Sequence, residues 1–190
     1  TFRLWLEDGE VPQSELGQAL FASRRQTAKA VRSGLTFSYA ASKPSSKAHA
    51  DTRTPSLLFD GRQSSASKDS VQYEGDVTIV ADLGAVVELK DVHLLAYHRK
   101  GVFAVKDVTF AISADKTAWS DVATIANPKT AAASVETSAI DMSAVVTGRA
   151  RYVRLSVAQA TNAERMLLAE IVINGKAAAE PATSVTPMAH

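Results

Sequence analysis

Short runs rich in Val, Ile, Thr and Tyr, separated by turn-forming residues, make up most of the chain after Leu35. They cover residues 35–40, 77–83, 86–97, 105–113, 118–125, 151–158 and 167–174. Residues 108–112, VTFAI, alternate between apolar and polar positions, which is typical of a half-buried strand, whereas residues 92–97, VHLLAY, are apolar on both sides and predict a central strand. Seven or so strands at irregular spacing predict an all-β sandwich.

The first 34 residues have a different pattern. Residues 1–13 alternate up to an Asp8-Gly9 turn and predict a short strand with a reversal. Ser14 is a candidate N-cap for a helix that ends at Gly34. The stripe that predicts this helix consists of Leu16, Ala19, Leu20, Ser23, Thr27, Ala30 and Val31. We therefore expect 1–34 to be the end of a preceding domain or a linker, 35–175 to form the sandwich, and the small, Pro-bearing residues 176–190 to be a flexible tail or linker.

Composition excludes several classes of function. The 190 residues are 46% hydrophobic, yet no apolar run approaches the roughly 20 residues of a membrane helix, so we expect no membrane span. Lys and Arg number 21 against 20 Asp and Glu, which gives no reason to expect nucleic-acid binding. The absence of cysteine excludes disulfides, thiolate catalysis and Cys-type zinc sites. Because the chain begins at Thr1 without Met, we expect it to be a piece of a longer protein.

Five blocks in a fixed order suggest a family. They are LLFDG (57–61), TIVADLG (78–84), FAISADKTAWSDVATI (110–125), ARYVRLSV (150–157) and LLAEIVING (167–175). Together they resemble the discoidin or F5/8 type C group of galactose-binding-like domains. Within that group they are most similar to the family 32 carbohydrate-binding modules appended to bacterial glycoside hydrolases and polysaccharide lyases. The resemblance covers about 35–175 and implies a jelly-roll sandwich with ligand loops at one end and a structural calcium ion.

An acidic residue lies within the last apolar run, at Ala169-Glu170. A buried carboxylate costs several kcal/mol unless a partner compensates it, and calcium accepts carboxylate and carbonyl oxygens. The resemblance implies that the side chains of Asp60 and Glu170 bind Ca2+. It also implies further ligands from the carbonyls of Leu57, Arg62 and Ala169 and from a loop hydroxyl, for which Ser65 and Ser70 compete. The alternative is that Asp60 only caps a turn and that Glu170 pairs with Arg62 or Arg151.

A sugar site needs an aromatic face beside groups that bond hydroxyls. Tyr97, His98, Arg99 and Phe103 lie where a strand leaves the predicted sheet. The resemblance implies that Tyr73 and Arg165 lie in loops at or near the same end. The alternative is that His98 is an exposed strand-end residue and that Arg99 and Lys100 form a solvated face. We interpret His93 as a packed sheet residue and Trp119 as a structural residue of a hairpin.

These features predict a noncatalytic carbohydrate-binding module in a bacterial, multidomain, glycan-degrading enzyme that is extracellular, cell-surface or periplasmic. Its partners would be a polysaccharide or oligosaccharide and the neighbouring domains. The basic run His98-Arg99-Lys100 favours an acidic glycan, because Arg binds carboxylate or sulfate oxygens through two hydrogen bonds. No catalytic motif and no second carboxylate pair suggests an enzyme. The alternative function is a structural or protein-contact sandwich, which the aromatic content of only 6% also fits.

Overall fold

The structure is a computed structural model, and it describes residues 34–129 and 135–177. Two predictions fall outside these ranges: the strand and helix of residues 1–33, and all but the first two residues of the 176–190 tail. Those two residues, Lys176 and Ala177, belong to the last strand. Within the described ranges, no helix has the length and apolar character needed to cross a membrane.

Seven strands and one short helical turn make up the described part. The elements are β1 (Ser38–Ala41), the 3-10 helix η1 (Lys47–His49), β2 (Val71–Tyr73), β3 (Val77–His98), β4 (Val105–Ser113), β5 (Ser120–Ala126), β6 (Ser138–Gln159) and β7 (Met166–Ala177). Every pair of neighbouring strands is antiparallel, in the order β2-β7-β3-β6-β4-β5, and β1 pairs with β3. The predicted all-β sandwich is confirmed.

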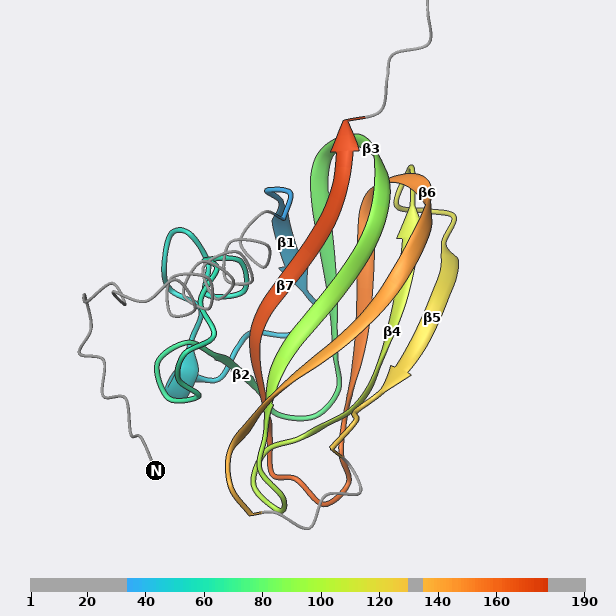
Figure 1. The fold of residues 1–190 in the computed structure, drawn as a ribbon. Coiled ribbons are helices and arrows are strands. Elements are labelled where there is room, and N and C mark those ends of the chain that lie inside the picture. Colours follow the sequence, from blue (N-terminus) through green and yellow to red (C-terminus); the bar gives the residue numbers. More distant parts are fainter. Residues whose placement is uncertain (1–33, 130–134, 178–190) are drawn as a thin grey trace, which may run out of the picture. The chain divides into compact units, whose positions relative to one another are not determined.

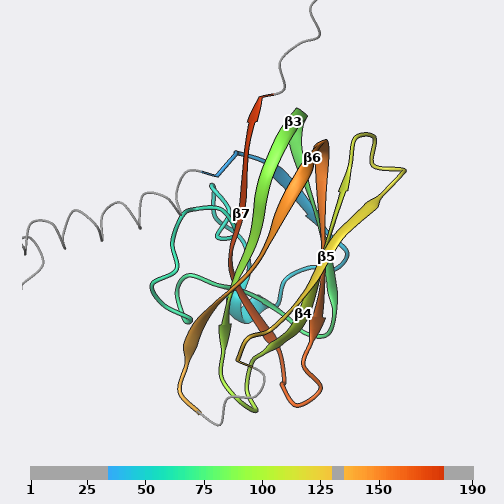
Figure 2. The same ribbon diagram turned by 45° about the vertical axis from the view of Figure 1, so that its right-hand side comes forward.

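Two long strands build both layers of the sandwich. The first part of β3 pairs with β1 and with the second part of β6, which in turn pairs with β4. The second part of β3 pairs with the first part of β6 and with β7. Figure 1 shows β3 and β6 each passing through the sandwich twice, and Figure 2 shows the same strands from another side. The two layers therefore share their central strands.

A bend in β3 carries the chain from one layer to the other. The register with β6 shifts between Asp82 and Val87, and Gly84 has a positive φ of 78° that other residues rarely adopt. The N–H of Gly84 donates to Oδ1 of Asp82 at 2.8 Å, and Arg151 of β6 donates to both oxygens of the same carboxylate at 2.8 and 3.0 Å. The bend therefore depends on the positive φ of Gly84 and on the Asp82 carboxylate, which accepts the Gly84 N–H.

The core lies between the layers. Alternate residues of each strand point inward, and they form one cluster of Val, Ile, Leu, Phe and Met side chains. Ile79, Phe110 and Leu155 come from one layer, and Leu94, Met142 and Ile173 come from the other. A second, smaller buried cluster consists of Leu95, Tyr97, Phe103, Leu167, Ala169 and Val172, with Ala66 and Val102 packed against it. It connects β7 to the loop before β2, through Ala66, and to the turn after β3, through Val102 and Phe103.

Candidate functional site

The Asp60-Gly61 turn lies against the last strand. The N–H of Ile171 donates to the carbonyl of Leu58 at 2.6 Å, and the N–H of Gly61 donates to Oε1 of Glu170 at 3.0 Å. Asp60 also closes its own turn, because its Oδ1 accepts the N–H of Arg62 at 2.9 Å. The structure thus brings together the two segments that carry the predicted metal ligands Leu57, Asp60, Arg62, Ala169 and Glu170.

Among the described residues, no cationic side chain pairs with Glu170. Its side chain is only 3% exposed, and Oε2 has no hydrogen-bond partner in the described part of the chain. Burial raises the pKa of Glu170 to about 7; the bond from Gly61 opposes this rise, and the negative charge of Asp60 adds to it. Of the two arginines considered as alternative partners, Arg151 is bound to Asp82 instead, and Arg62 acts on Glu170 through its backbone. A divalent cation would supply what this carboxylate lacks, so the residues present fit calcium.

Carbonyl oxygens would have to complete such a site. Among residues 34–129 and 135–177, no group of three or more His, Cys, Asp or Glu side chains is placed to hold a metal. Calcium differs from zinc in this respect, because backbone carbonyls commonly supply several of its six to eight ligands. A cation beside Glu170 would thus depend on the backbone of the Asp60 turn and of β7.

The serine-rich loop between that turn and β2 is organised by Asp69. The carboxylate of Asp69 accepts hydrogen bonds from the N–H and the hydroxyl of Ser64 and from the N–H of Ser65. The bond from the Ser64 hydroxyl has the largest effect, and it holds the pKa of Asp69 below its usual value. Ser70 is buried, and its hydroxyl donates to the carbonyl of Ala66 at 2.6 Å. The hydroxyl of Ser65 contacts only that of Ser67, at 3.0 Å, so Ser65 is the less committed of the two candidate metal ligands.

Two turns meet at the end of the sandwich where β3 ends and β7 begins. We call residues 98–104 and 160–165 the turn cluster. Arg99 bridges to Phe103 within the first turn, and Phe103 bridges to Arg165 of the second. The N–H of Ala104 donates to the carbonyl of Arg165, and the N–H of Glu164 donates to the carbonyl of Val102, both at 3.1 Å. The structure thus brings together the predicted ligand residues His98, Arg99, Phe103 and Arg165.

The aromatic candidates are placed differently from the expectation. Tyr73 lies on β2 rather than in a loop and is 1% exposed, which corrects its predicted position. Tyr97 and Phe103 belong to the second buried cluster, at 4% and 6% exposure. The physical reason is that a ring beside a hydrophobic core stabilises the fold more when it is buried there than when it is exposed. In this conformation none of the three rings offers a face to solvent.

The basic candidates remain accessible. Arg99 is exposed, and its Nε donates to the carbonyl of Val135 at 3.1 Å. Arg165 has a side chain that is 32% exposed and pairs with Glu164 at 2.9 Å. Lys100 is exposed at the tip of the first turn. The accessible surface of the turn cluster is therefore basic and polar rather than aromatic.

His98 is buried and not an exposed strand-end residue, which corrects the alternative considered for it. It is 6% exposed, its Nδ1 contacts Nδ2 of Asn127 at 3.1 Å, and its Nε2 is buried without a partner in the described structure. Burial, and then the charge of Lys129, lowers the pKa of His98. Sequence reasoning missed Asn127, although a polar side chain between an apolar strand and Pro128 was a signal available in the sequence.

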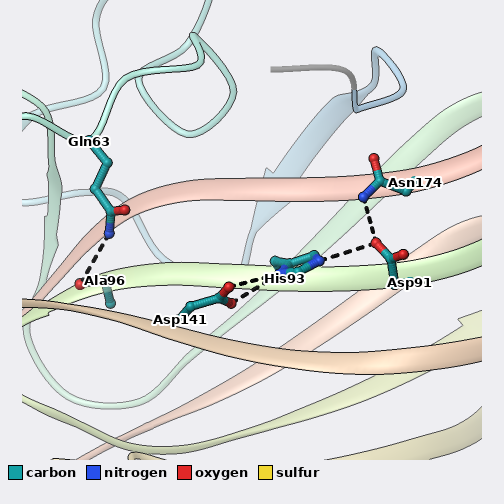
Figure 3. A network of polar contacts seen from close by, with 6 residues as sticks. All are labelled: Gln63, Asp91, His93, Ala96, Asp141 and Asn174. Atoms are coloured by element: carbon teal, nitrogen blue, oxygen red, sulfur yellow. Dashed lines mark hydrogen bonds and ion pairs between the residues drawn. The ribbon is translucent and has the colours of Figure 1, made fainter. Parts of the chain in front are cut away.

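A second polar group, also missed, lies on β3 and its two neighbours. Nδ1 of His93 contacts both oxygens of Asp141 at 3.0 Å, and its Nε2 contacts Oδ1 of Asp91 at 3.1 Å. Asn174 of β7 donates to the same Oδ1 of Asp91, and Gln63 of the serine-rich loop reaches the carbonyl of Ala96 (Figure 3). His93 is thus part of a partly exposed network, not a packed sheet residue, and it lies on the strands rather than in the turn cluster.

Solved structures with this fold include several carbohydrate-related proteins. The C-terminal domain of a chitobiase from Bacteroides fragilis has a TM-score of 0.53 at 16% identity, with 78% of this chain and 98% of that chain covered. A pectin binding carbohydrate binding module has a TM-score of 0.51 at 17% identity, with coverage of 78% and 96%. Truncated AlyQ, with CBM32 and alginate lyase domains, has a TM-score of 0.50 at 14% identity; the match covers 76% of this chain but 34% of that one.

These likenesses concern the fold, since each identity is below a fifth. No curated protein matches the sequence. The family model of the F5/8 type C domain, however, matches residues 39–171, which include both the Asp60 turn and the first half of β7. The order of the sequence blocks, the sandwich and this match agree, and the chain belongs to the F5/8 type C domain family.

Proposed function

We propose that this domain is a noncatalytic carbohydrate-binding module that attaches a glycan-degrading enzyme to its polymer. The observation that carries the proposal is the F5/8 type C match over residues 39–171, with a sandwich shared by a pectin binding module and by the CBM32-containing AlyQ. A fold alone does not determine function, so the residues of the site must also support the proposal. Its contribution is the turn cluster, where loop residues on a rigid sheet present hydrogen-bond donors.

The ligand we propose is an oligosaccharide or polysaccharide with acidic groups. The accessible side chains of the turn cluster include Arg99, Lys100 and Arg165, whereas the rings nearby are buried. Guanidinium and ammonium groups bind carboxylate and sulfate oxygens through charge-assisted bonds, and such binding does not require an aromatic platform. Each contact is weak, and the module would act by raising the effective concentration of an attached catalytic domain.

We propose further that calcium stabilises the module, with Asp60, Glu170 and neighbouring carbonyls as ligands. The partnerless Oε2 of Glu170 supports this, as does the placement of the Asp60 turn against β7. The ion would neutralise a buried carboxylate and connect an early turn to the last strand. We also propose that the parent protein is bacterial and exported, since glycan polymers of this kind lie outside the cell.

The test is binding of the domain to a glycan array and, by calorimetry, to polygalacturonate and to its methyl-esterified form, which has the same sugars without the charge. We expect the charged polymer to bind and the double change Arg99→Gln/Lys100→Gln to weaken it by about tenfold or more. Lys176→Gln is the matched control, because Lys176 pairs with Glu88 at the other end of β7. Equal binding by both variants would contradict the proposed site.

One observation favours the alternative, a structural or protein-contact sandwich. Tyr73, Tyr97 and Phe103, which were expected to contact ligand, are buried. A glycan array without hits, together with retained binding to a catalytic domain of the same protein, would support this alternative. New reducing ends released from the array polysaccharides would instead contradict the noncatalytic assignment.

A further inference from the structure

Asn127 connects three segments beneath the turn cluster. It is 4% exposed and follows β5 directly. Its Nδ2 lies 2.7 Å from the carbonyl of Val105, at the start of β4, and 3.1 Å from Nδ1 of His98, at the end of β3. Its Oδ1 accepts the N–H of Lys129 at 2.8 Å, and its own N–H donates to the carbonyl of Lys106 at 2.9 Å. One side chain thus holds both ends of the turn that carries Arg99 and Lys100.

The orientation of the Asn127 amide is fixed by the backbone on both sides. The carbonyl of Val105 can only accept, so the NH2 group must face it. The N–H of Lys129 can only donate, so the amide oxygen must face that group. A flipped amide would place two acceptors together on one side and two donors together on the other. The NH2 group is therefore also the group that faces His98.

The amide orientation determines the tautomer of His98. Because Nδ2 of Asn127 donates, Nδ1 of His98 must accept, and the single proton of the neutral imidazole must then lie on Nε2. Nε2 is buried and has no acceptor among the described residues. An unpaired buried donor costs about 1–3 kcal/mol, so an acceptor that reaches this N–H would stabilise the site, and the described structure does not supply one.

We propose that Asn127 is the positioning residue of the ligand site: by fixing His98 as the Nε2–H tautomer, it makes the turn cluster select ligands that place an acceptor oxygen at His98. This inference rests on the proposed function. The chemical class that fits is a sugar oxygen that accepts a hydrogen bond, and an uronate carboxylate is a stronger acceptor than a sugar hydroxyl. The charge of Lys129 acts on the imidazole and favours an anionic oxygen over a cationic ligand.

The experiment combines nitrogen NMR of the histidine rings with calorimetry on the whole chain. The probes are galactose and galacturonate, which differ by a carboxylate at one carbon. At pH 8 we expect the His98 spectrum of the unliganded wild type to show the Nε2–H tautomer.

Asn127→Asp offers acceptors in place of the NH2 group and should move the proton to Nδ1. Asn127→Ala removes the constraint without adding charge, which keeps the test valid if the Asp variant does not fold. Asn174→Ala, in the network of Figure 3, is the control and should leave the His98 tautomer unchanged.

We expect Asn127→Asp to bind galacturonate about tenfold more weakly than wild type, Asn127→Ala to lose affinity only as far as its His98 tautomer shifts, and Asn174→Ala to bind it unchanged. A wild-type His98 protonated on Nδ1 would overturn the inference. Affinity that stays constant while the tautomer changes would also overturn it and would leave the proposed function standing. If wild type binds neither sugar, nor any glycan of the array, the proposed function itself fails and this inference fails with it.

Discussion

The N–H of Gly61 and the carboxylate of Glu170 lie 3.0 Å apart although 109 residues separate them in the chain. This bond connects an early turn to the last strand, and the second oxygen of the same buried carboxylate has no partner among the residues that the structure describes. Backbone amides of the Asp60 turn do not fully compensate a buried charge, because the pKa of Glu170 is still raised to about 7, so the turn and β7 are held together at an energetic cost. That cost makes the site testable.

Calcium should stabilise the wild type, and Glu170→Gln should remove most of the effect. At a calcium concentration 100-fold above the dissociation constant, we expect a gain of about 2.7 kcal/mol in the free energy of unfolding. In chelator at pH 8, Glu170→Gln should be more stable than wild type, because the variant buries no charge. Thermal unfolding with and without chelator measures both effects. Glu88→Gln, on the surface, is the control, and a wild type indifferent to calcium would contradict the site.

Acid should destabilise the domain through His98. Its pKa in the folded state lies below the ordinary value of about 6.5, because the folded site disfavours the charged ring. Its contribution to stability is therefore complete above about pH 6.5 and is lost as the pH falls through the lowered folded pKa. Urea unfolding of wild type and of His98→Gln at pH 8 and pH 5 should show a larger acid-induced loss in wild type. Equal losses would contradict this role for His98.

Removing the hydroxyl of Tyr97 should not harm the fold. Burial raises the pKa of Tyr97 to about 12, and the backbone of Ser65 opposes this rise. Ser65 does not reach hydrogen-bond geometry, so among the described residues the buried hydroxyl has no partner. Tyr97→Phe keeps the ring in the second buried cluster and deletes an unsatisfied polar group, so we expect the free energy of unfolding to stay the same or to rise by about 1 kcal/mol. A loss of more than that in denaturant unfolding would indicate an unrecognised partner. Tyr73→Phe gives the comparison with the other buried tyrosine.

A methyl group at Gly175 should be costly. A Cβ there would lie 2.6 Å from the carbonyl oxygen of Glu88 on the neighbouring strand β3, and backbone cannot move aside easily. We expect Gly175→Ala to lower the free energy of unfolding by about 1–3 kcal/mol. Gly148→Ala is the matched control, because its Cβ would meet the end of the Ile112 side chain at 3.1 Å, which can rotate away. Equal losses for both would contradict the argument.

The sequence predicted the strands whose patterns are strong, and the weaker ones were missed. The predictions at 105–113 and 167–174 match β4 and most of β7, and VHLLAY does lie on β3, a central strand. The first part of β6 was missed because Ser, Ala and Asp dilute its alternation, and β2 was hidden in a polar segment. The runs 77–83 and 86–97 were read as two strands, whereas they form the one bent strand β3.

The candidate site was predictable in part. The pairing of the Asp60 turn with Glu170 follows from the resemblance and from the cost of a buried charge. The burial of Tyr73 and the role of Asn127 could not be predicted, because both depend on contacts between strands that are far apart in sequence: Tyr73 pairs with Met166, and Asn127 reaches Val105 and His98. Local periodicity carries no information about such neighbours.

Because β3 and β6 each belong to both layers, the two described layers cannot unfold independently of each other. A change that destabilises one layer also destabilises the strands that it shares with the other. Conditions that change the amide exchange rates of one layer should therefore change those of the other in the same direction. A force applied to the last strand should likewise unfold both layers together rather than one sheet alone.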